Sequence, residues 1–268
     1  MAVHIPGARG AKYTAHPGGF PERRVGEVPA VTPAIMREVQ KLAQEEYFCD
    51  IIQITECAGL EAARLAAAML GGHGRGQRIV VLAGGGNMGA TGLAATRHLV
   101  NWGFLVEPVF AEVESEFSFN TRRQVQILRA ASLIDSGAEA TSEAVMEQHL
   151  LNADLVIDAI AGYGLEGPAT GIGAALVHLV EQARRPVLAL DIPTGVSAAS
   201  GVSYSPAIKA VTTLALDLPK IGAVSAAARP AVGELYLADL GIPRLAYERV
   251  GVHVGHTFTE GPLIRLRR

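Results

Sequence analysis

The chain has 268 residues, of which 49% are hydrophobic and 18% are charged, and its formal net charge is −3. This composition predicts a sizeable buried core and supplies no general electrostatic reason to bind nucleic acid or an acidic membrane surface. Cys49 and Cys57 fit neither a disulfide framework nor a zinc motif, so reduced thiols and a cytoplasmic location are expected. No stretch is apolar for long enough to cross a bilayer.

The first helix is expected to follow an N-terminal arm. Residues 1–30 are rich in Gly, Pro and Arg and lack the apolar core of a secretory signal, which favours an extended arm. Thr32 and Pro33 then supply an N-cap and a proline at the first helical position. Apolar side chains recur at helical spacing over residues 35–43, as expected of a core-facing stripe. A second apolar helix is predicted from about Ile54 to Leu70.

The central stretch joins a strand to a helix through glycines. An apolar, β-branched run at Ile79 to Ala83 predicts a strand, and a helix is expected to begin near Gly92. Glycines between them allow a ligand to approach the backbone, and the first amides of the helix would attract phosphate. The fingerprint GxGxxG matches at residues 84–89, with Glu107 as a candidate ribose-binding acid. A plain turn between strand and helix is the alternative.

Strands and helices alternate along the rest of the chain. This pattern predicts an α/β fold in which a mainly parallel sheet is covered by helices on both faces. The further strands are expected at Leu105 to Phe110, Leu155 to Ile160 and Val187 to Leu190. The further helices are expected at residues 117–131, 141–151 and 171–184.

Two aspartates stand where predicted strands end. Asp158 lies in the strand at residues 155–160, and Asp191 directly follows the strand at residues 187–190. Either acid alone could cap a helix or form a loop. Because ligands of open α/β sheets bind beyond the carboxyl ends of the strands, the two acids and the glycine loop together predict a site.

Four motifs in order carry a resemblance to a known family. The sequence resembles the NAD(P)H-hydrate epimerase family, or YjeF N-terminal domain, from about Val31 to Leu240. The family pattern reads GPGNNGGDG, then DA[IL]FGxGLxGP, DIPSG and LPKLG. It is matched by GGGNMGATG at 84–92, DAIAGYGLEGP at 158–168, DIPTG at 191–195 and LPKIG at 218–222.

The resemblance implies a Rossmann-like three-layer sandwich over residues 31–245, between the arm at 1–30 and a tail at 246–268. It also implies an enzyme that interconverts the two forms of hydrated NADH or NADPH. The DIPSG aspartate is the family's acid/base, so Asp191 takes this role, with Lys220 assigned to the catalytic set. The nucleotide-binding positions implied are Gly86, Asn87, Met88, Gly89, Ala90, Thr91, Gly162, Tyr163, Gly164, Leu165 and Asp191.

The departures from the family pattern fall in the nucleotide and ion loop. Family members bind potassium through an asparagine, the DA[IL]FG aspartate and the DIPSG serine, which correspond here to Met88, Asp158 and Thr194. A thioether is a poor ligand for a hard cation, so weak or absent potassium is predicted, with Asp158 and Thr194 as the remaining ligands. Thr91 replaces a nucleotide-contacting aspartate, and Ala90 replaces a glycine.

Three functions are compatible with these motifs. The first is an NAD(P)H-hydrate epimerase with a small-molecule nucleotide substrate and a separate hydrate dehydratase as its partner. The second is a catalytically silent ligand-binding or scaffold protein of the same fold, which Met88 and Thr91 favour. The third is a nicotinamide-dependent oxidoreductase. The sequence contains no recognisable Tyr/Lys or His/Asp set for hydride transfer, which speaks against this function. A homodimer is usual in the family, with Val31 to Phe48 as a plausible contact, and the tail could cross to a second subunit or hang free.

Overall fold

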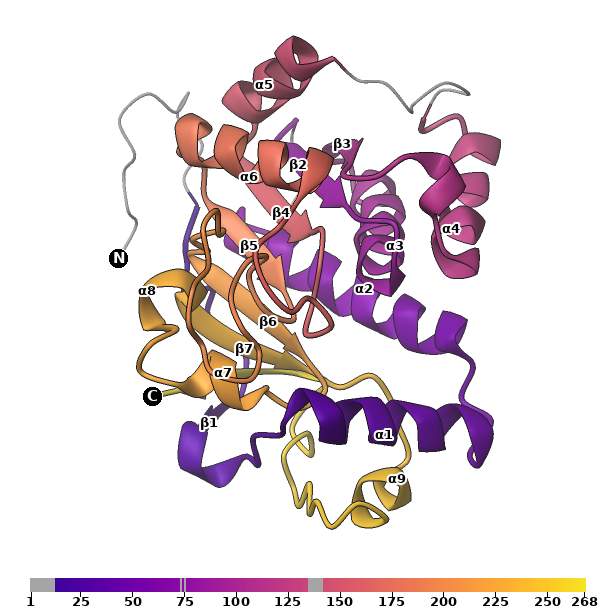
Figure 1. Ribbon diagram of the computed structural model, residues 1–268, viewed down its shortest axis with the longest axis vertical. Coiled ribbons are helices and arrows are strands. Elements are labelled where there is room, and N and C mark those ends of the chain that lie inside the picture. The colour runs from indigo at the N-terminus through magenta and orange to yellow at the C-terminus, as the bar shows by residue number, and fades with distance from the viewer. Residues whose placement is uncertain (1–12, 73, 75, 135–141) are drawn as a thin grey trace.

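One eight-stranded sheet runs through the part of the chain that the computed structural model describes, residues 13–72, 74, 76–134 and 142–268 (Figure 1). The strand order is β1-β8-β7-β6-β5-β4-β2-β3, and every neighbouring pair is parallel except β7 and β8. The strands are β1 (Glu22–Arg24), β2 (Arg78–Ala83), β3 (Leu105–Phe110), β4 (Leu155–Ala159), β5 (Val187–Leu190), β6 (Thr212–Leu216), β7 (Glu234–Ala238) and β8 (Leu263–Arg267).

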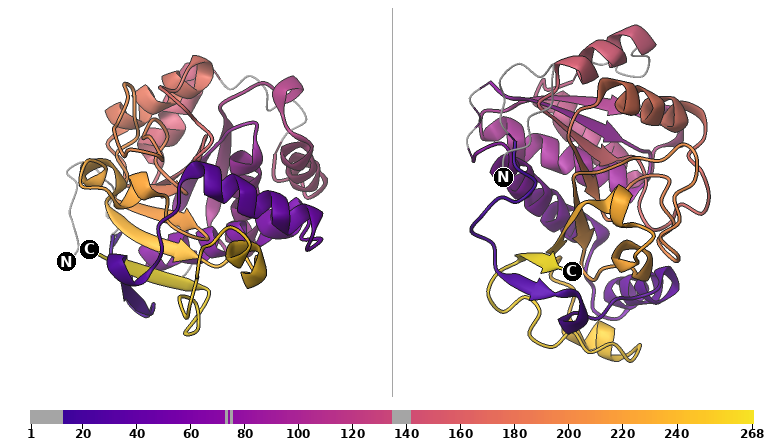
Figure 2. Two further views of the ribbon diagram at one scale, coloured as in Figure 1. Left: turned by 60° about the horizontal axis from the view of Figure 1, so that its bottom comes forward. Right: turned by 90° about the vertical axis from the view of Figure 1, so that its left-hand side faces the viewer.

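Helices cover both faces of the sheet (Figure 2). Successive side chains of β2 point to opposite faces, and both sets are buried. Ile79 and Val81 join a core with α2 and α3, whereas Val80 and Leu82 join a core with α5 and α6. The helices are α1 (Pro33–Glu45), α2 (Ile51–Met69), α3 (Asn87–Asn101), α4 (Phe119–Ala130), α5 (Glu143–Asn152), α6 (Gly171–Ala183), α7 (Ile221–Val224), α8 (Arg229–Val232) and α9 (Arg244–Glu248).

The predicted α/β class and mainly parallel sheet are confirmed. β3 and β5 have the predicted bounds, β2 begins one residue earlier and β4 ends one residue earlier than predicted. The Thr32 hydroxyl caps α1 by accepting from the Ile35 amide at 3.2 Å. The helix predicted at residues 141–151 is α5, and residue 141 lies outside the described residues.

The helix after β2 begins earlier than the sequence predicts. Its expected start near Gly92 is wrong, because α3 begins at Asn87 with Gly86 as its N-cap. The glycines at 89 and 92 are part of the helix, where they allow close packing. A Cβ at Gly92 would lie 2.6 Å from the Ala159 Cβ of β4. These glycines therefore bring α3 onto the sheet and do not lengthen the loop.

The terminal segments also differ from the expectation of an arm and a free or crossing tail. β1, within residues 1–30, and β8, within residues 246–268, pair with each other at one edge of the sheet. Figure 2 shows the yellow C-terminal strand beside the indigo β1. Leu263, Ile264 and Leu266 are buried, and Arg265 forms ion pairs with Glu22 and Glu234. This short strand is not predicted from the sequence, because three of the last four residues are arginines.

The apolar stripe of α1 is part of the core. Met36, Val39 and Ala43 are fully buried within the same chain. A homodimer contact through Val31 to Phe48 therefore stays a prediction that would use other side chains, such as Phe48, which is 84% exposed.

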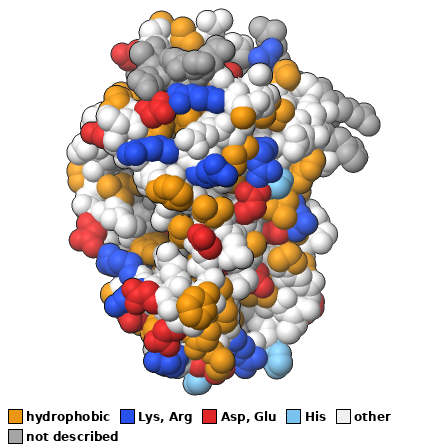
Figure 3. Space-filling view, turned by 90° about the vertical axis from the view of Figure 1, so that its right-hand side faces the viewer, with side chains coloured by type: hydrophobic (Ala, Val, Ile, Leu, Met, Phe, Trp, Pro, Cys, Tyr) orange, Lys and Arg blue, Asp and Glu red, His pale blue; other side chains and the backbone are white. Residues whose placement is uncertain are grey.

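No helix among the described residues is long and apolar enough to cross a membrane. Figure 3 shows acidic and basic side chains interspersed on one face of the described chain.

The topology creates a crevice between β2 and β4. The chain moves from β2 outward to β3, then returns across β2 to form β4 on its other side. Loops that leave the carboxyl ends of β2 and β4 consequently run in opposite directions. Such a switch point is where open α/β sheets bind ligands.

Candidate active site

A cavity of about 480 Å³ lies at this switch point. The carboxyl ends of β2, β4, β5 and β6 open onto it, and α1 and α2 close the opposite side. Its predicted wall residues are Gly86, Asn87, Met88, Thr91, Gly162, Tyr163, Gly164, Leu165, Asp191 and Lys220. The sequence-predicted positions from four separate motifs thus meet around one cavity.

Asp191 and Lys220 form a buried ion pair at the cavity wall. Both side chains are 1% exposed, and Lys220 Nζ lies 2.5 Å from Asp191 Oδ1. Lys220 also donates to the Leu216 carbonyl at 2.9 Å, and the Tyr163 amide donates to Asp191 Oδ2 at 2.9 Å. Each carboxylate oxygen of Asp191 therefore has a donor that fixes its orientation. Because the charges compensate each other, the pair tolerates burial.

The backbone at Asp191 is also specialised. Its φ of +66° lies in the left-handed region, which costs a non-glycine residue about 1 kcal/mol. The Asp191 amide donates to the Leu214 carbonyl of the neighbouring strand at 2.7 Å. The end of β5 is thereby held in a turn that points the carboxylate into the crevice.

Tyr163 connects the ion pair to α1. Its ring centroid lies 5.1 Å from Lys220 Nζ, within the range of a cation–π contact, and its hydroxyl donates to Gln40 Oε1 at 2.6 Å. Burial, and then the charge of Asp191, raises the pKa of Tyr163 to about 12. Tyr163 is therefore a neutral phenol at physiological pH and positions its neighbours without exchanging a proton.

The first turn of α3 supplies amide donors to the crevice. The Ala90 amide makes the first intrahelical bond, to the Gly86 carbonyl at 3.2 Å. The amides of Asn87, Met88 and Gly89 precede it, at the positive end of a 15-residue helix. This arrangement suits a phosphate or another anion.

A clamp from α4 holds the glycine loop in place. The Thr121 hydroxyl lies 2.8 Å from the carbonyl oxygens of both Gly85 and Gly86, and the Ser118 amide donates to Gly85 at 2.8 Å. Asn120, which is 2% exposed, donates to the Thr55 hydroxyl of α2 at 2.6 Å. The loop that forms one wall is consequently fixed by polar groups at the start of α4, and Asn120 ties α4 to α2.

Two glycines of the loop serve packing. A Cβ at Gly84 would lie 2.0 Å from the Ile160 carbonyl oxygen, and one at Gly89 would lie 1.7 Å from the Gly84 carbonyl oxygen. A Cβ at Gly86, by contrast, would meet nothing within 4 Å. Gly89 and the buried Ala90 are absent from the cavity wall. Of these positions, Gly86 is the one that lines the cavity and has space for a side chain, so a side chain added there would contact a bound ligand.

Met88 provides an apolar surface beside the ion pair. A Cβ at Gly162 would lie 2.5 Å from the Met88 methyl carbon and 3.1 Å from Asp191 Oδ2. The thioether thus packs against the turn that presents the Asp191 carboxylate. Thr91 lines the same cavity, and its hydroxyl donates to the Asn87 carbonyl at 3.0 Å.

Asp158 and Thr194, the two remaining candidate ligands of a cation, are hydrogen-bonded to each other. Asp158 is fully buried, accepts from the Thr194 amide at 2.8 Å and from the Thr194 hydroxyl at 2.7 Å, and its pKa is raised to about 6 by burial against these bonds. Within the described chain, no group of three or more His, Cys, Asp or Glu side chains could hold a metal ion. With Met88 in place of an oxygen ligand, the residues present do not fit potassium.

Several residues around the site escaped the sequence analysis. Glu107 is exposed in the middle of β3 and away from the cavity, so the expectation of a ribose contact there is wrong. Glu112, just after β3, lines the cavity instead, and the rule of strand ends could have found it. Arg37 and Gln40 of α1 and Thr55 of α2 also line it, but helix periodicity alone marks no such polar positions.

Comparison with known proteins identifies the family. Residues 52–222 match the family described as the YjeF-related protein N-terminus. The chain belongs to this family. The NAD(P)H-hydrate epimerase of Dehalogenimonas lykanthroporepellens is 35% identical over 242 residues, which cover 89% of this chain and 93% of that protein. The NAD(P)H-hydrate epimerase of Rhodopirellula baltica is 30% identical over 217 residues, 81% of this chain and 86% of that protein.

One longer relative and one solved structure are also similar to this chain. The bifunctional NAD(P)H-hydrate repair enzyme Nnr of Moorella thermoacetica is 34% identical over 80% of this chain, which spans 41% of that protein's length. The crystal structure of the yeast protein YNL200c superimposes with a TM-score of 0.74 at 20% identity, covering 89% of this chain and all of that one. The structural likeness concerns the fold of the family.

Proposed function

We propose that the protein is an NAD(P)H-hydrate epimerase, which interconverts the R and S forms of hydrated NADH and NADPH. The observation that carries the proposal is the buried, doubly oriented Asp191 carboxylate at the wall of a cavity that α3 lines with amide donors. Relatives named NAD(P)H-hydrate epimerase, matched over most of their length, support it.

In this proposal Asp191 is the acid/base. The epimers differ at the ring carbon that bears the added hydroxyl, a hemiaminal carbon bonded to that oxygen and to the ring nitrogen. Inverting it requires one of these two bonds to break and to re-form on the other face, while one proton is given and one is taken back, so that no reactant is consumed. A carboxylate can do both within one turnover. Lys220 orients the carboxylate between transfers, and the ring face of Tyr163 holds Lys220 in place.

The nucleotide is proposed to lie across the crevice with a phosphate on the α3 amides. The Asn87, Met88 and Gly89 amides, together with the turn at Gly162 to Leu165, are the proposed contacts. Met88 would then face the reacting end of the nucleotide, since its methyl lies next to the Gly162 turn and Asp191. No step is assigned to potassium.

The remaining features of the proposal concern the protein's context. A hydrate dehydratase is the proposed pathway partner, because a relative of this chain is named as a bifunctional NAD(P)H-hydrate repair enzyme. A homodimer and a cytoplasmic location are also proposed; the free thiols of Cys49 and Cys57 suit a reducing compartment.

A catalytically silent ligand-binding protein is the second candidate. It is favoured by Met88 and Thr91, which place a thioether and a hydroxyl on the cavity wall where the family pattern has an amide and a carboxylate. One experiment separates the two candidates. The protein is mixed with the unreactive epimer of NADH hydrate and an independent dehydratase, and NADH recovery is followed. Recovery above the rate of spontaneous epimerisation supports the enzyme, and recovery at the spontaneous rate supports the silent protein.

A further inference from the structure

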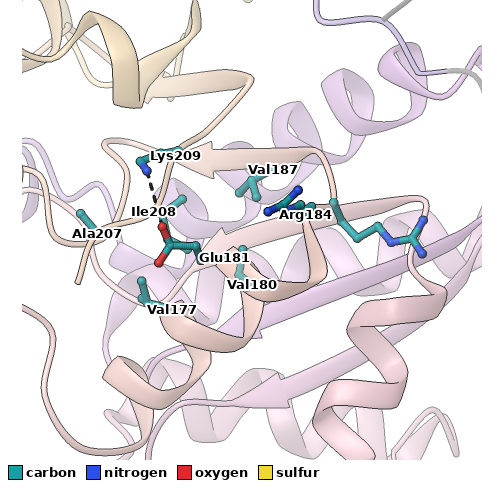
Figure 4. Close-up of a pocket in the computed structure, with 9 residues that line it drawn as sticks. Val177, Val180, Glu181, Arg184, Val187, Ala207, Ile208 and Lys209 are labelled. Atoms are coloured by element: carbon teal, nitrogen blue, oxygen red, sulfur yellow. Dashed lines mark hydrogen bonds and ion pairs between the residues drawn. The ribbon is translucent and has the colours of Figure 1, made fainter. Parts of the chain in front are cut away.

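A second cavity, of about 320 Å³, lies at the amino end of β5 (Figure 4). Asp191 follows the carboxyl end of the same strand, so the two cavities lie at opposite ends of β5. The floor of the second cavity is aliphatic and consists of Val177, Val180, Val187 and Ile208, each at most 6% exposed. Its rim is charged and consists of Glu181, Arg184, Arg185 and Lys209.

Arg184 is the distinctive residue of this rim. It is the C-cap of α6 with φ 51° and ψ 38°, a left-handed position at which glycine is the usual residue. Figure 4 shows Arg184 and Val187 among the residues that line the cavity. Among the residues that the structure describes, no acid or carbonyl pairs with the Arg184 guanidinium. Arg184 is thus an exposed cation at the edge of an aliphatic floor, in an unfavourable backbone conformation and without a protein partner among the described residues.

The other charges of the rim leave it positive. Lys209 and Glu181 lie 3.5 Å apart and are 75% and 64% exposed, which makes their ion pair weak. Arg185 donates to the Leu151 carbonyl and so remains an uncompensated cation. The rim residues thus carry three cations and one carboxylate, in a chain whose net charge is −3.

We propose that this cavity binds a small carboxylate with a short apolar tail. The guanidinium of Arg184 can receive the carboxylate through two parallel hydrogen bonds, and the aliphatic floor can bury the tail. The cavity volume is at the lower end of the range for small-molecule sites, so a ligand of several carbon atoms is appropriate. Neither the nucleotide nor the Asp191 site is required for this binding.

The segment that borders the cavity also reaches the candidate active site. The Ile208 amide donates to the Thr194 carbonyl at 2.9 Å, and the Thr194 hydroxyl donates to Asp158. A tail resting on Ile208 should therefore slow hydrogen exchange at the Ile208 amide, which gives a readout independent of enzyme activity.

The test uses hexanoate as the probe and isothermal titration calorimetry with the full chain. Hexanoate should bind saturably, while hexanol and acetate, which each lack one half of the probe, should bind at least tenfold more weakly. Arg184→Gln should weaken hexanoate binding at least tenfold. Glu181→Gln should strengthen it severalfold, because it removes the only carboxylate of the rim. Arg123→Gln, an exposed substitution on α4, is the matched control and should leave it unchanged.

The opposite signs for the two rim variants protect the test from misfolding, since a damaged protein would not bind more tightly. The proposal is overturned if hexanoate does not saturate the protein, or if Arg184→Gln binds it as well as the unaltered chain. It is also overturned if inorganic phosphate binds more tightly than hexanoate, because the site would then recognise an anion without a tail.

Discussion

The two walls of the candidate active site are built in different ways. On the β5 and β6 side, geometry depends on side chains: the Asp191 and Lys220 charges compensate each other and the Tyr163 amide orients the carboxylate. On the β2 and α3 side, geometry depends on backbones that touch, with Gly84 against Ile160. We call the β5 and β6 side the wall of charges and the β2 and α3 side the wall of backbones. Removing a charge should destabilise the first wall, and adding an atom should destabilise the second.

This difference accounts for three of the glycines at which the loop keeps the family pattern. Gly84, Gly89 and Gly92 are retained, and each would bring a Cβ to within 2.6 Å of a neighbouring atom. Met88 and Thr91 depart from the pattern, and both face the cavity. Packing therefore preserves the shape of the loop while its side chains change what the loop presents to a ligand.

The largest expected effect tests the wall of charges. Lys220→Met removes the cation and leaves Asp191 buried without compensation, so unfolding free energy should fall by about 3–5 kcal/mol. Lys209→Met, at an exposed and weakly paired lysine, is the control and should change stability by less than about 0.5 kcal/mol. Urea denaturation measures both. A loss at Lys220 no larger than that at Lys209 would show that the ion pair does not hold this wall.

The next effect tests the wall of backbones. Gly89→Ala should cost about 3 kcal/mol, because its Cβ would overlap the Gly84 carbonyl oxygen in a loop held by other close contacts. Gly86→Ser places a side chain into open space at an N-cap, where serine is favoured, and should change stability by less than about 1 kcal/mol. Urea denaturation of the two variants gives the comparison. Equal losses would mean that contact distance does not govern this loop.

The overall fold is more predictable from the sequence than the site is. Apolar, β-branched runs such as Ile79 to Ala83 and Val187 to Leu190 predict strands because a covered parallel sheet demands them. The strands at 212–216 and 234–238 were not predicted, and β8 was hidden by its arginines. Motif order predicted that Asp191 and Lys220 belong together, but not that Gln40 and Thr55, on helices, complete the cavity. Such contacts depend on how helices pack, which no local pattern encodes.

A pH effect concerns a second acid near the wall of charges. Asp217 is 1% exposed, and burial raises its pKa to about 7 although Lys220 lowers it. The folded chain therefore holds a proton that the unfolded chain loses above about pH 4, so stability should fall as pH rises from about 4 to 7 and then level off. Asp217→Asn should reduce this fall by about 2 kcal/mol in urea denaturation at pH 5 and pH 8. An unchanged pH slope would contradict the assignment.

The smallest expected effect concerns potassium. With Met88 in the loop and both Asp158 oxygens hydrogen-bonded, replacing sodium by potassium should change nucleotide affinity by less than about twofold. Met88→Asn restores one oxygen ligand and should increase the difference between the two ions. The measurement is nucleotide titration in matched chloride salts. A strong potassium requirement of the unaltered chain would mean that backbone oxygens supply the missing ligand.

The central claim is that Asp191 acts as the acid/base of an epimerase. Asp191→Asn keeps the size of the side chain and removes its titratable proton. The decisive measurement is the rate of interconversion of the two NADH-hydrate epimers by the unaltered chain and by Asp191→Asn, both verified as folded. The account predicts a loss of about a hundredfold or more in rate with little change in nucleotide affinity. Equal rates in the two proteins, or no rate above the spontaneous reaction in either, would contradict it.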